Sequence, residues 1–471
     1  MKFTVERDAL AEAVAWVARA LPSRPVIPVL SGLLLEAEDD LTLSCFDYEV
    51  SARMSVPASV DEPGTALVPG RLLAEITRSL PGLPAEFADD PDGVSLTCGE
   101  ASFTLVTLQA AEYPALPELP QLAGTADGGA LAAAIGQVAP AASRDDTLPM
   151  LTGVSVELEG ETITLAATDR YRLAVRELAW NPALRERTAV MVPARTLSDA
   201  ARMMGPGMTV RIMLREGAGQ PGPAGPGGRI VAAPAAGSSD AMIGFEAGGR
   251  RLTTRLLAGE FIKYRSRFPA EFGCTADLPA TAFTEAVRRV SLVAERGSPV
   301  RLSFGPGRVT VDAGTQGHAR ARESVPAEFT GEEPVIAFNP HYLLDGIAAA
   351  TTPIPPNAAT SSAPHHGSPQ PSSPAEQDAS IRDAPPRAAA PRDEPDEAGQ
   401  ADETNQTERT QRRDRTEGTQ RPDGTTVADG AITRVRLQFT SATKPAVLTG
   451  TTDSGSGPDF RYLVVPQRVQ Q

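Results

Sequence analysis

The residues of this chain that could carry out chemistry are few and scattered. The sequence has four histidines and three cysteines, at positions His318, His341, His365, His366, Cys45, Cys98 and Cys274. None of them stands at the spacing of a zinc site, and the sequence contains no HExxH, P-loop or GxSxG motif. The sequence therefore predicts no catalytic centre, no metal site and no cofactor, and an enzyme is the disfavoured interpretation.

The densest group of reactive side chains is the stretch TDRYRLAV, residues 168–175, where Asp169 stands between Thr168 and Arg170 and close to Arg172. A carboxylate beside two guanidinium groups has the composition of a catalytic cluster, but an ion pair at the end of a strand has the same composition. The preceding run, ETITLAA, alternates as a β-strand does. We interpret Asp169 as a residue of local structure, and the rest of the chain must decide whether its neighbours form a site.

Length and charge narrow the class of protein. A chain of 471 residues is too long for one core and predicts about three domains. The formal net charge of −15 argues against a protein that coats nucleic acid through bulk attraction, although it allows a local basic surface. We expect a reduced, cytoplasmic protein, because cysteines are few, the first residues carry charges where a signal peptide is apolar, and no run is long enough to span a membrane.

Three segments share one helical spacing, with apolar residues at i, i+4, i+7 and i+11. They are Leu10/Val14/Val17/Leu21, Leu131/Ile135/Val138/Ala142 and Phe283/Val287/Val290/Ala294. Two residues before each stripe stands a possible N-cap, namely Asp8, Gly129 or Thr281. The pattern predicts three copies of one unit.

The segments after each helix repeat as well. Each copy has two alternating strands joined by a tight turn, at Asp39-Asp40, Glu159-Gly160 and Gly305-Pro306-Gly307. A second helix follows, with a proline near its first turn and Leu73, Leu197 or Leu344 four residues later. We therefore predict an α+β fold of three repeated domains, 1–122, 123–273 and 274–471, each with two helices packed on antiparallel sheets.

Two low-complexity segments interrupt this pattern. A Gly/Pro-rich loop covers about 217–239, and a polar, charged segment without large apolar residues covers about 351–431. The composition of the second predicts disorder. It is either a tolerated surface insertion in the third domain or a regulatory, partner-binding segment, and the sequence leaves both open.

The repeats, together with RPVIPVLSGLLLE, RDDTLPMLTGVSVE, ATDRYRLAV, EFIKYRSRFP and the terminal YLVVPQRV, resemble the bacterial DNA polymerase III β sliding clamp family. The likeness covers the chain outside the two low-complexity segments. It implies a DNA-clamp fold that forms half of a ring, a head-to-tail homodimer around duplex DNA, and a role as processivity factor. The implied partners are the polymerase III α subunit, the clamp loader complex, and other DNA polymerases and repair proteins that carry clamp-binding peptides.

The resemblance also implies particular site residues. A hydrophobic peptide-binding pocket would be lined by Leu151, Thr168, Arg170, Tyr171, Arg172, Leu173, Ile262, Arg267, Leu463 and Val465. Contacts with DNA would come from Arg24, Arg71, Arg144 and Arg195, and the dimer interface would contain Phe103 and Leu292. Each arginine has the alternative of a solvated surface charge, and Phe103 and Leu292 have the alternative of ordinary core positions.

Three positions depart from the family pattern. Ile262 stands where proline is usual, Arg267 where an aliphatic residue is usual, and Gln467 where an apolar residue is common. An arginine at an apolar rim either turns outward or pairs with an acidic partner. The departures suggest altered affinity for peptides or inhibitors, as in a specialised or inhibitor-resistant extra copy of the clamp. A repeat-built interaction scaffold that does not encircle DNA is the further alternative.

Overall fold

The computed structural model describes residues 1–215, 241–295, 297–314, 319–353, 432–451 and 460–467. The predicted loop at 217–239 and the predicted segment at 351–431, apart from residues 351–353, lie outside the described residues. None of the helices in the described ranges is long and apolar enough to cross a membrane.

The described elements form three repeats with one order: strand, helix, five strands, helix, three strands. The first repeat contains β1 (Lys2–Val5), α1 (Arg7–Val17), β2 (Gly32–Ala37), β3 (Leu41–Phe46), β4 (Val50–Val56), β5 (Ala58–Glu62), β6 (Gly64–Pro69), α2 (Gly70–Ser79), β7 (Ala85–Asp90), β8 (Gly93–Cys98) and β9 (Ala101–Leu105). The second contains β10 (Gln121–Asp127), α3 (Gly128–Val138), β11 (Gly153–Glu159), β12 (Thr162–Thr168), β13 (Arg172–Ala179), β14 (Asn181–Pro182), β15 (Thr188–Pro193), α4 (Ala194–Ala201), β16 (Thr209–Arg215), β17 (Met242–Ala247) and β18 (Arg250–Arg255).

The third repeat contains β19 (Cys274–Pro279), α5 (Ala280–Ser291), β20 (Val300–Gly305), β21 (Arg308–Gly314), β22 (Arg320–Pro326), β23 (Glu328–Thr330), β24 (Val335–Phe338), α6 (Pro340–Thr351), β25 (Arg434–Phe439), β26 (Ala446–Thr451) and β27 (Phe460–Val464). The boundary placed between 122 and 123 falls inside β10, whereas 274 is the first residue of β19. The exact domain boundaries remain predictions.

The repeats agree down to single backbone hydrogen bonds. After the last strand of each repeat, one N–H group returns to the strand before the second helix, from Leu108 to the Leu67 carbonyl, from Leu257 to Met191 and from Gln467 to Ala337, at 2.8 Å in all three cases. Gln467, which departs from the family pattern in its side chain, therefore has the same main-chain role as Leu108 and Leu257.

The predicted N-caps of the first helices were wrong. The N-cap positions are Glu6, Asp127 and Pro279, each two residues before the expected one. Of these three, Asp127 caps through its side chain, which accepts from the Ala130 N–H at 2.8 Å. In α6 the buried leucine is Leu343 rather than Leu344, because this helix begins at its proline instead of after it.

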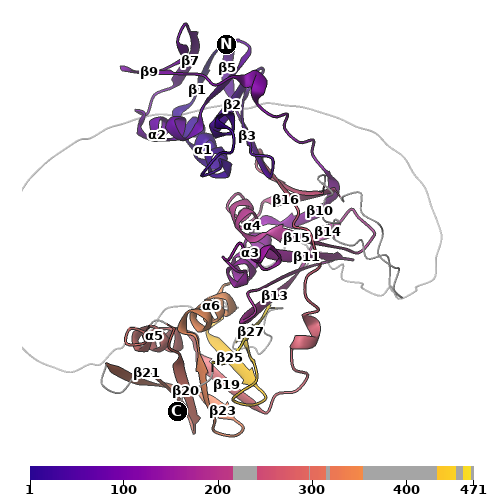
Figure 1. Cartoon of the computed structure of the whole chain (residues 1–471), viewed down its shortest axis with the longest axis vertical. Coiled ribbons are helices and arrows are strands. Elements are labelled where there is room, and N and C mark those ends of the chain that lie inside the picture. The colour runs from indigo at the N-terminus through magenta and orange to yellow at the C-terminus, as the bar shows by residue number, and fades with distance from the viewer. Residues whose placement is uncertain (216–240, 296, 315–318, 354–431, 452–459, 468–471) are drawn as a thin grey trace, which may run out of the picture. The chain divides into compact units, whose positions relative to one another are not determined.

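The two helices of each repeat pack on each other and on strands of their own repeat. Figure 1 shows α3 beside α4 and α5 beside α6, each pair over one face of the strands. The predicted stripes lie in the core, as with Leu10, Val14 and Val17 of α1, which are fully buried. All three cysteines are buried as free thiols, and burial raises the pKa of Cys45 to about 12.

Strand pairing continues from one repeat into the next. In one nine-stranded sheet β18 pairs antiparallel with β4, and in the other β13 pairs antiparallel with β27. The sheet orders are β14-β10-β16-β17-β18-β4-β3-β2-β6 and β15-β11-β12-β13-β27-β26-β25-β19-β23. Two smaller sheets, β5-β1-β7-β8-β9 and β22-β21-β20-β24, belong to the first and third repeats alone.

Substitution of Gly346 by alanine tests how closely α6 packs on β27. A Cβ atom at this position would lie 2.5 Å from the ring of Tyr462, whereas one at Gly136 of α3 would meet nothing within 4 Å. We expect Gly346→Ala to lower the free energy of unfolding by about 1–3 kcal/mol through overpacking. Gly136→Ala should raise it by about 0.5–1 kcal/mol, because alanine loses less backbone entropy in a helix. Denaturant unfolding measures both, and equal effects of the two substitutions would contradict the packing described here.

Candidate functional site

The turn between β12 and β13 is built by Asp169. Its carboxylate accepts the N–H groups of Tyr171 at 3.0 Å and Arg172 at 3.1 Å, and Arg170, which follows Asp169, has a positive φ of 81°. The first repeat has the same turn, where Asp47 accepts from Glu49 and Val50 and Tyr48 has φ 74°. Asp169 therefore serves local structure, and the turn itself is a property of the repeat.

Arg172 connects the second repeat to the third. Its guanidinium donates to Asp169 at 2.9 Å, to Asp345 of α6 at 2.5 Å and to the Pro140 carbonyl at 2.5 Å. The guanidinium carbon also lies 4.7 Å from the centre of the Tyr342 ring. Only 10% of the Arg172 side chain is exposed. The residue borders a groove, but its charge is engaged within the chain.

The groove beside this turn has a volume of about 890 Å³. Its floor includes Leu173 and Leu463, which face each other across the β13–β27 pairing and are 2% and 5% exposed. They belong to a small apolar cluster that also contains Ala166, Val175 and Tyr264. Because this floor is assembled from strands of two repeats, the groove exists only where β13 and β27 pair.

The structure brings most of the predicted pocket residues to this groove. Its lining includes Leu151, Thr168, Arg170, Arg172, Leu173, Ile262, Arg267, Leu463 and Val465. Tyr171 is not among the lining residues. It is 59% exposed and stacks on Tyr342, with ring centres 6.2 Å apart. Peptide binding by these residues remains a prediction.

Sequence reasoning missed about half of the lining. The missed residues are Thr147, Leu148, Pro149, Met150, Ser266, Phe268, Pro269, Thr440, Lys444 and Pro445. Residues 147–150 and 266–269 lie in or beside motifs that carried the family resemblance, so this signal could have found them. Thr440, Lys444 and Pro445 belong to the connection between β25 and β26, where no sequence pattern indicates a site.

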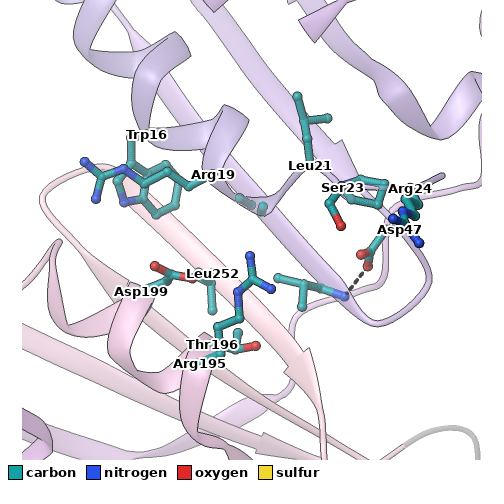
Figure 2. A pocket seen from close by; sticks show the side chains of 14 residues that line it. Trp16, Arg19, Leu21, Ser23, Arg24, Asp47, Arg195, Thr196, Asp199 and Leu252 are labelled. Atoms are coloured by element: carbon teal, nitrogen blue, oxygen red, sulfur yellow. Dashed lines mark hydrogen bonds between the residues drawn. The ribbon is translucent and has the colours of Figure 1, made fainter. Parts of the chain in front are cut away.

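A second, smaller cavity of about 280 Å³ lies where the first and second repeats meet, and it is lined by Arg19, Arg24 and Arg195 together with Asp47 and Asp199. We call it the cationic cavity, because its arginines outnumber its aspartates. Figure 2 shows Arg195 of α4 projecting between the end of α1, with Trp16 and Arg19, and the loop that carries Ser23 and Arg24. The structure thus brings together two of the four predicted DNA-contacting arginines and adds Arg19, which sequence reasoning missed because it follows the helix as an ordinary charged residue.

The other two predicted arginines lie elsewhere. Arg71 of α2 donates to the Pro22 carbonyl at 3.0 Å and so lies beside the loop of Arg24. Arg144 is exposed in the segment between α3 and β11 and does not line the cationic cavity. DNA contact by any of the four arginines remains a prediction.

The comparisons with known proteins cover all three repeats. Models of the DNA polymerase III beta subunit match residues 1–117 as N-terminal domain, 126–263 as central domain and 265–354 as C-terminal domain. The chain belongs to the β sliding clamp family.

Individual relatives agree with this assignment. The clamp is 51% identical to the "Beta sliding clamp" of Streptomyces coelicolor over 356 residues, which are 75% of this chain and 90% of that one. It is 44% identical to the "Beta sliding clamp homolog GriR" of Streptomyces muensis, over 74% of this chain and 88% of that one. The solved sliding clamp of Bacillus subtilis, at 22% identity, has the same fold, with a TM-score of 0.72 and full coverage of both chains.

The clamp is thus a processivity factor of DNA replication with the three-domain clamp fold. The predicted interface residues of this clamp lie on an edge strand and at the end of a helix. Phe103 lies half-buried on β9, and Leu292 is 81% exposed just after α5, the helix that packs beside β22. Their presence in a dimer interface remains a prediction.

Removal of the Arg172 guanidinium should weaken the clamp at the junction of its second and third repeats. We expect Arg172→Met to lower the free energy of unfolding by about 2–4 kcal/mol, because Asp169 would keep a largely buried, unpaired charge. Arg202→Gln is the control. Its side chain is 60% exposed and 3.8 Å from Asp199, so the change should stay within about 0.5 kcal/mol. Denaturant unfolding compares the two, and an Arg172→Met clamp as stable as the control would refute the structural role.

Proposed function

We propose that two copies of this clamp close into a head-to-tail ring around duplex DNA by pairing β9 of one copy with β22 of the other. The ring would hold the replicative polymerase at its template by topology, with only weak phosphate contacts. Tight contacts would oppose sliding, so an acidic chain is compatible with this task. The clamp has no catalytic role in this proposal and acts as an accessory subunit.

The observation that carries this proposal is the set of sheet edges. β9 corresponds to β18 and β27, and β22 corresponds to β4 and β13, yet only β9 and β22 have no partner strand across a junction in the described structure. The five-stranded sheet ending in β9 and the four-stranded sheet beginning with β22 would join in the strand order of the two nine-stranded sheets. Unpaired edges that long are commonly covered by another strand.

The two existing junctions predict the register of the third. Val50 faces Thr254 in one, and Arg172 faces Val464 in the other. Equivalent residues of the repeats are assigned by matching hydrogen bonds. The side-chain bond between Thr42 of β3 and Ser55 of β4 corresponds to the bond between Thr310 of β21 and Ser324 of β22, and both measure 3.0 Å. When the register of the two existing junctions is applied to these equivalent residues, Leu105 of one copy lies opposite Ala319 of the other, and Ser102 lies opposite Arg322.

A cysteine pair tests this register. Facing residues in antiparallel strands have Cα atoms about 4.5–5.5 Å apart, within the range of a disulfide. We therefore expect a clamp carrying both Ser102→Cys and Arg322→Cys to form a covalent dimer under mild oxidation, seen on non-reducing gels. Ser102 and Arg322 are both exposed, whereas the native cysteines are buried and should not compete.

Arg320 supplies the control, because it lies two residues from Arg322 on the same face of β22. Ser102→Cys with Arg320→Cys should cross-link far more slowly. Equal rates for the two pairs would exclude the proposed register. A protein that remains monomeric by mass in solution at micromolar concentration would exclude the ring.

The cationic cavity supports the DNA-facing part of the proposal. Arg19, Arg24 and Arg195 converge there from two repeats, and Arg71 lies beside the same loop. Positive side chains without base-reading geometry suit sequence-independent contact with phosphates. Arg144 is included on resemblance to the family alone.

The large groove supports the partner-binding part. An apolar floor with a few orienting polar groups suits a short peptide segment of a partner protein. We assign to this groove the polymerase III α subunit, the clamp loader, and other polymerases and repair proteins that carry clamp-binding peptides. Leu173, Leu463 and Val465 provide the apolar contacts, and the cations at the rim are available for polar ones.

A further inference from the structure

Four cationic side chains line the groove, and three of them, apart from the ion-paired Arg172, stand on three separate connections of the chain. Arg170 belongs to the β12–β13 turn, Arg267 to the connection between β18 and β19, and Lys444 to the β25–β26 connection. The lining residues of the groove include no aspartate and no glutamate. The described wall of the groove is therefore apolar with positive charge only.

Within the part of the chain that the structure describes, no ion pair neutralises these three charges. Arg170, Arg267 and Lys444 are exposed, and none of them forms an ion pair with another described residue. Asp145 lies close enough to Arg170 to feel its charge, which contributes to lowering the pKa of Asp145 after its hydrogen bonds with Thr147. Arg267 and Lys444 thus carry the larger part of the uncompensated charge.

Neighbouring arginines behave differently. Arg172 is bound by Asp169 and Asp345, and Arg265, two residues before Arg267, donates to Glu157 at 3.0 Å on the wall of an adjacent cavity of about 470 Å³. The chain thus satisfies the cations that have a structural role. Among the cations that line the groove, Arg172 is held in this way, whereas Arg170, Arg267 and Lys444 form no ion pair with another described residue.

Building on the peptide-binding groove proposed above, we propose that Arg267 and Lys444 make it selective for peptides that carry carboxylates beside their apolar anchors. The apolar floor would bind the anchors, and the two cations would receive aspartate or glutamate side chains at the rim. Charge pairs at such a rim contribute to affinity mainly at low salt and discriminate between partners. Arg267 and Lys444 both combine exposure with a position on the groove wall.

Two peptides of the same length test this selectivity by fluorescence anisotropy with the full chain. One is a labelled ten-residue peptide with three large apolar residues and two aspartates, and the other replaces the aspartates by asparagines. We expect the aspartate peptide to bind about fivefold more tightly at 50 mM salt, and the ratio to fall towards one at 500 mM salt. The double variant Arg267→Gln/Lys444→Gln should abolish the preference at low salt.

Lys263→Gln is the matched control, since Lys263 is an exposed cation of the same connection that does not line the groove. Together with Arg202→Gln, an exposed position outside the groove, it gives a double variant of equal net charge that should retain the fivefold preference. Equal binding of both peptides to the unmodified clamp would overturn the selectivity and leave the peptide groove standing. Binding of neither peptide would overturn the groove and the selectivity together, and a preference that survives in Arg267→Gln/Lys444→Gln would remove these two residues from the account.

Discussion

Antiparallel pairing of main chains across the junctions is the interaction on which the rest of this clamp depends. A strand that ends a sheet exposes N–H and C=O groups that must find partners in water or in another strand. In this chain β4 meets β18 and β13 meets β27 in one register, so that each junction extends a sheet of one repeat into the next. Side chains can then vary between repeats while the geometry of the junction persists.

The groove beside the β12–β13 turn is a consequence of one such junction. Leu173 and Leu463 become a common floor because their strands pair, and Arg172 lies next to them with its charge held by Asp169 and Asp345. The equivalent position in the first repeat is Val50, whose strand pairs in the same register but lacks this ion-pair cluster. The turn of the second repeat thus differs from the equivalent turn of the first repeat in a few side chains, while the two share one backbone conformation.

Much of the fold could be predicted from the sequence, because its determinants are local. The helical stripes, the tight turns and the period of the repeat all follow from residues close together in the chain, whereas the predicted N-cap positions were wrong by two residues. The site was less accessible. Arg172 contacts Asp345 and Tyr462, which are 173 and 290 positions away, so its structural role could not be read from TDRYRLAV alone. Lys444 was missed for the same reason, since only folding brings its connection to the groove.

The central claim is that this chain holds DNA by enclosing it, and topology tests that claim most directly. The protein is placed on nicked circular DNA by its loader, separated from unbound protein by gel filtration, and the DNA is then cut once with a restriction enzyme. The account predicts that the protein remains with the circular DNA and is released after the cut, because a closed ring slides off free ends. Retention on the linear DNA, with the ends left unblocked, would contradict it.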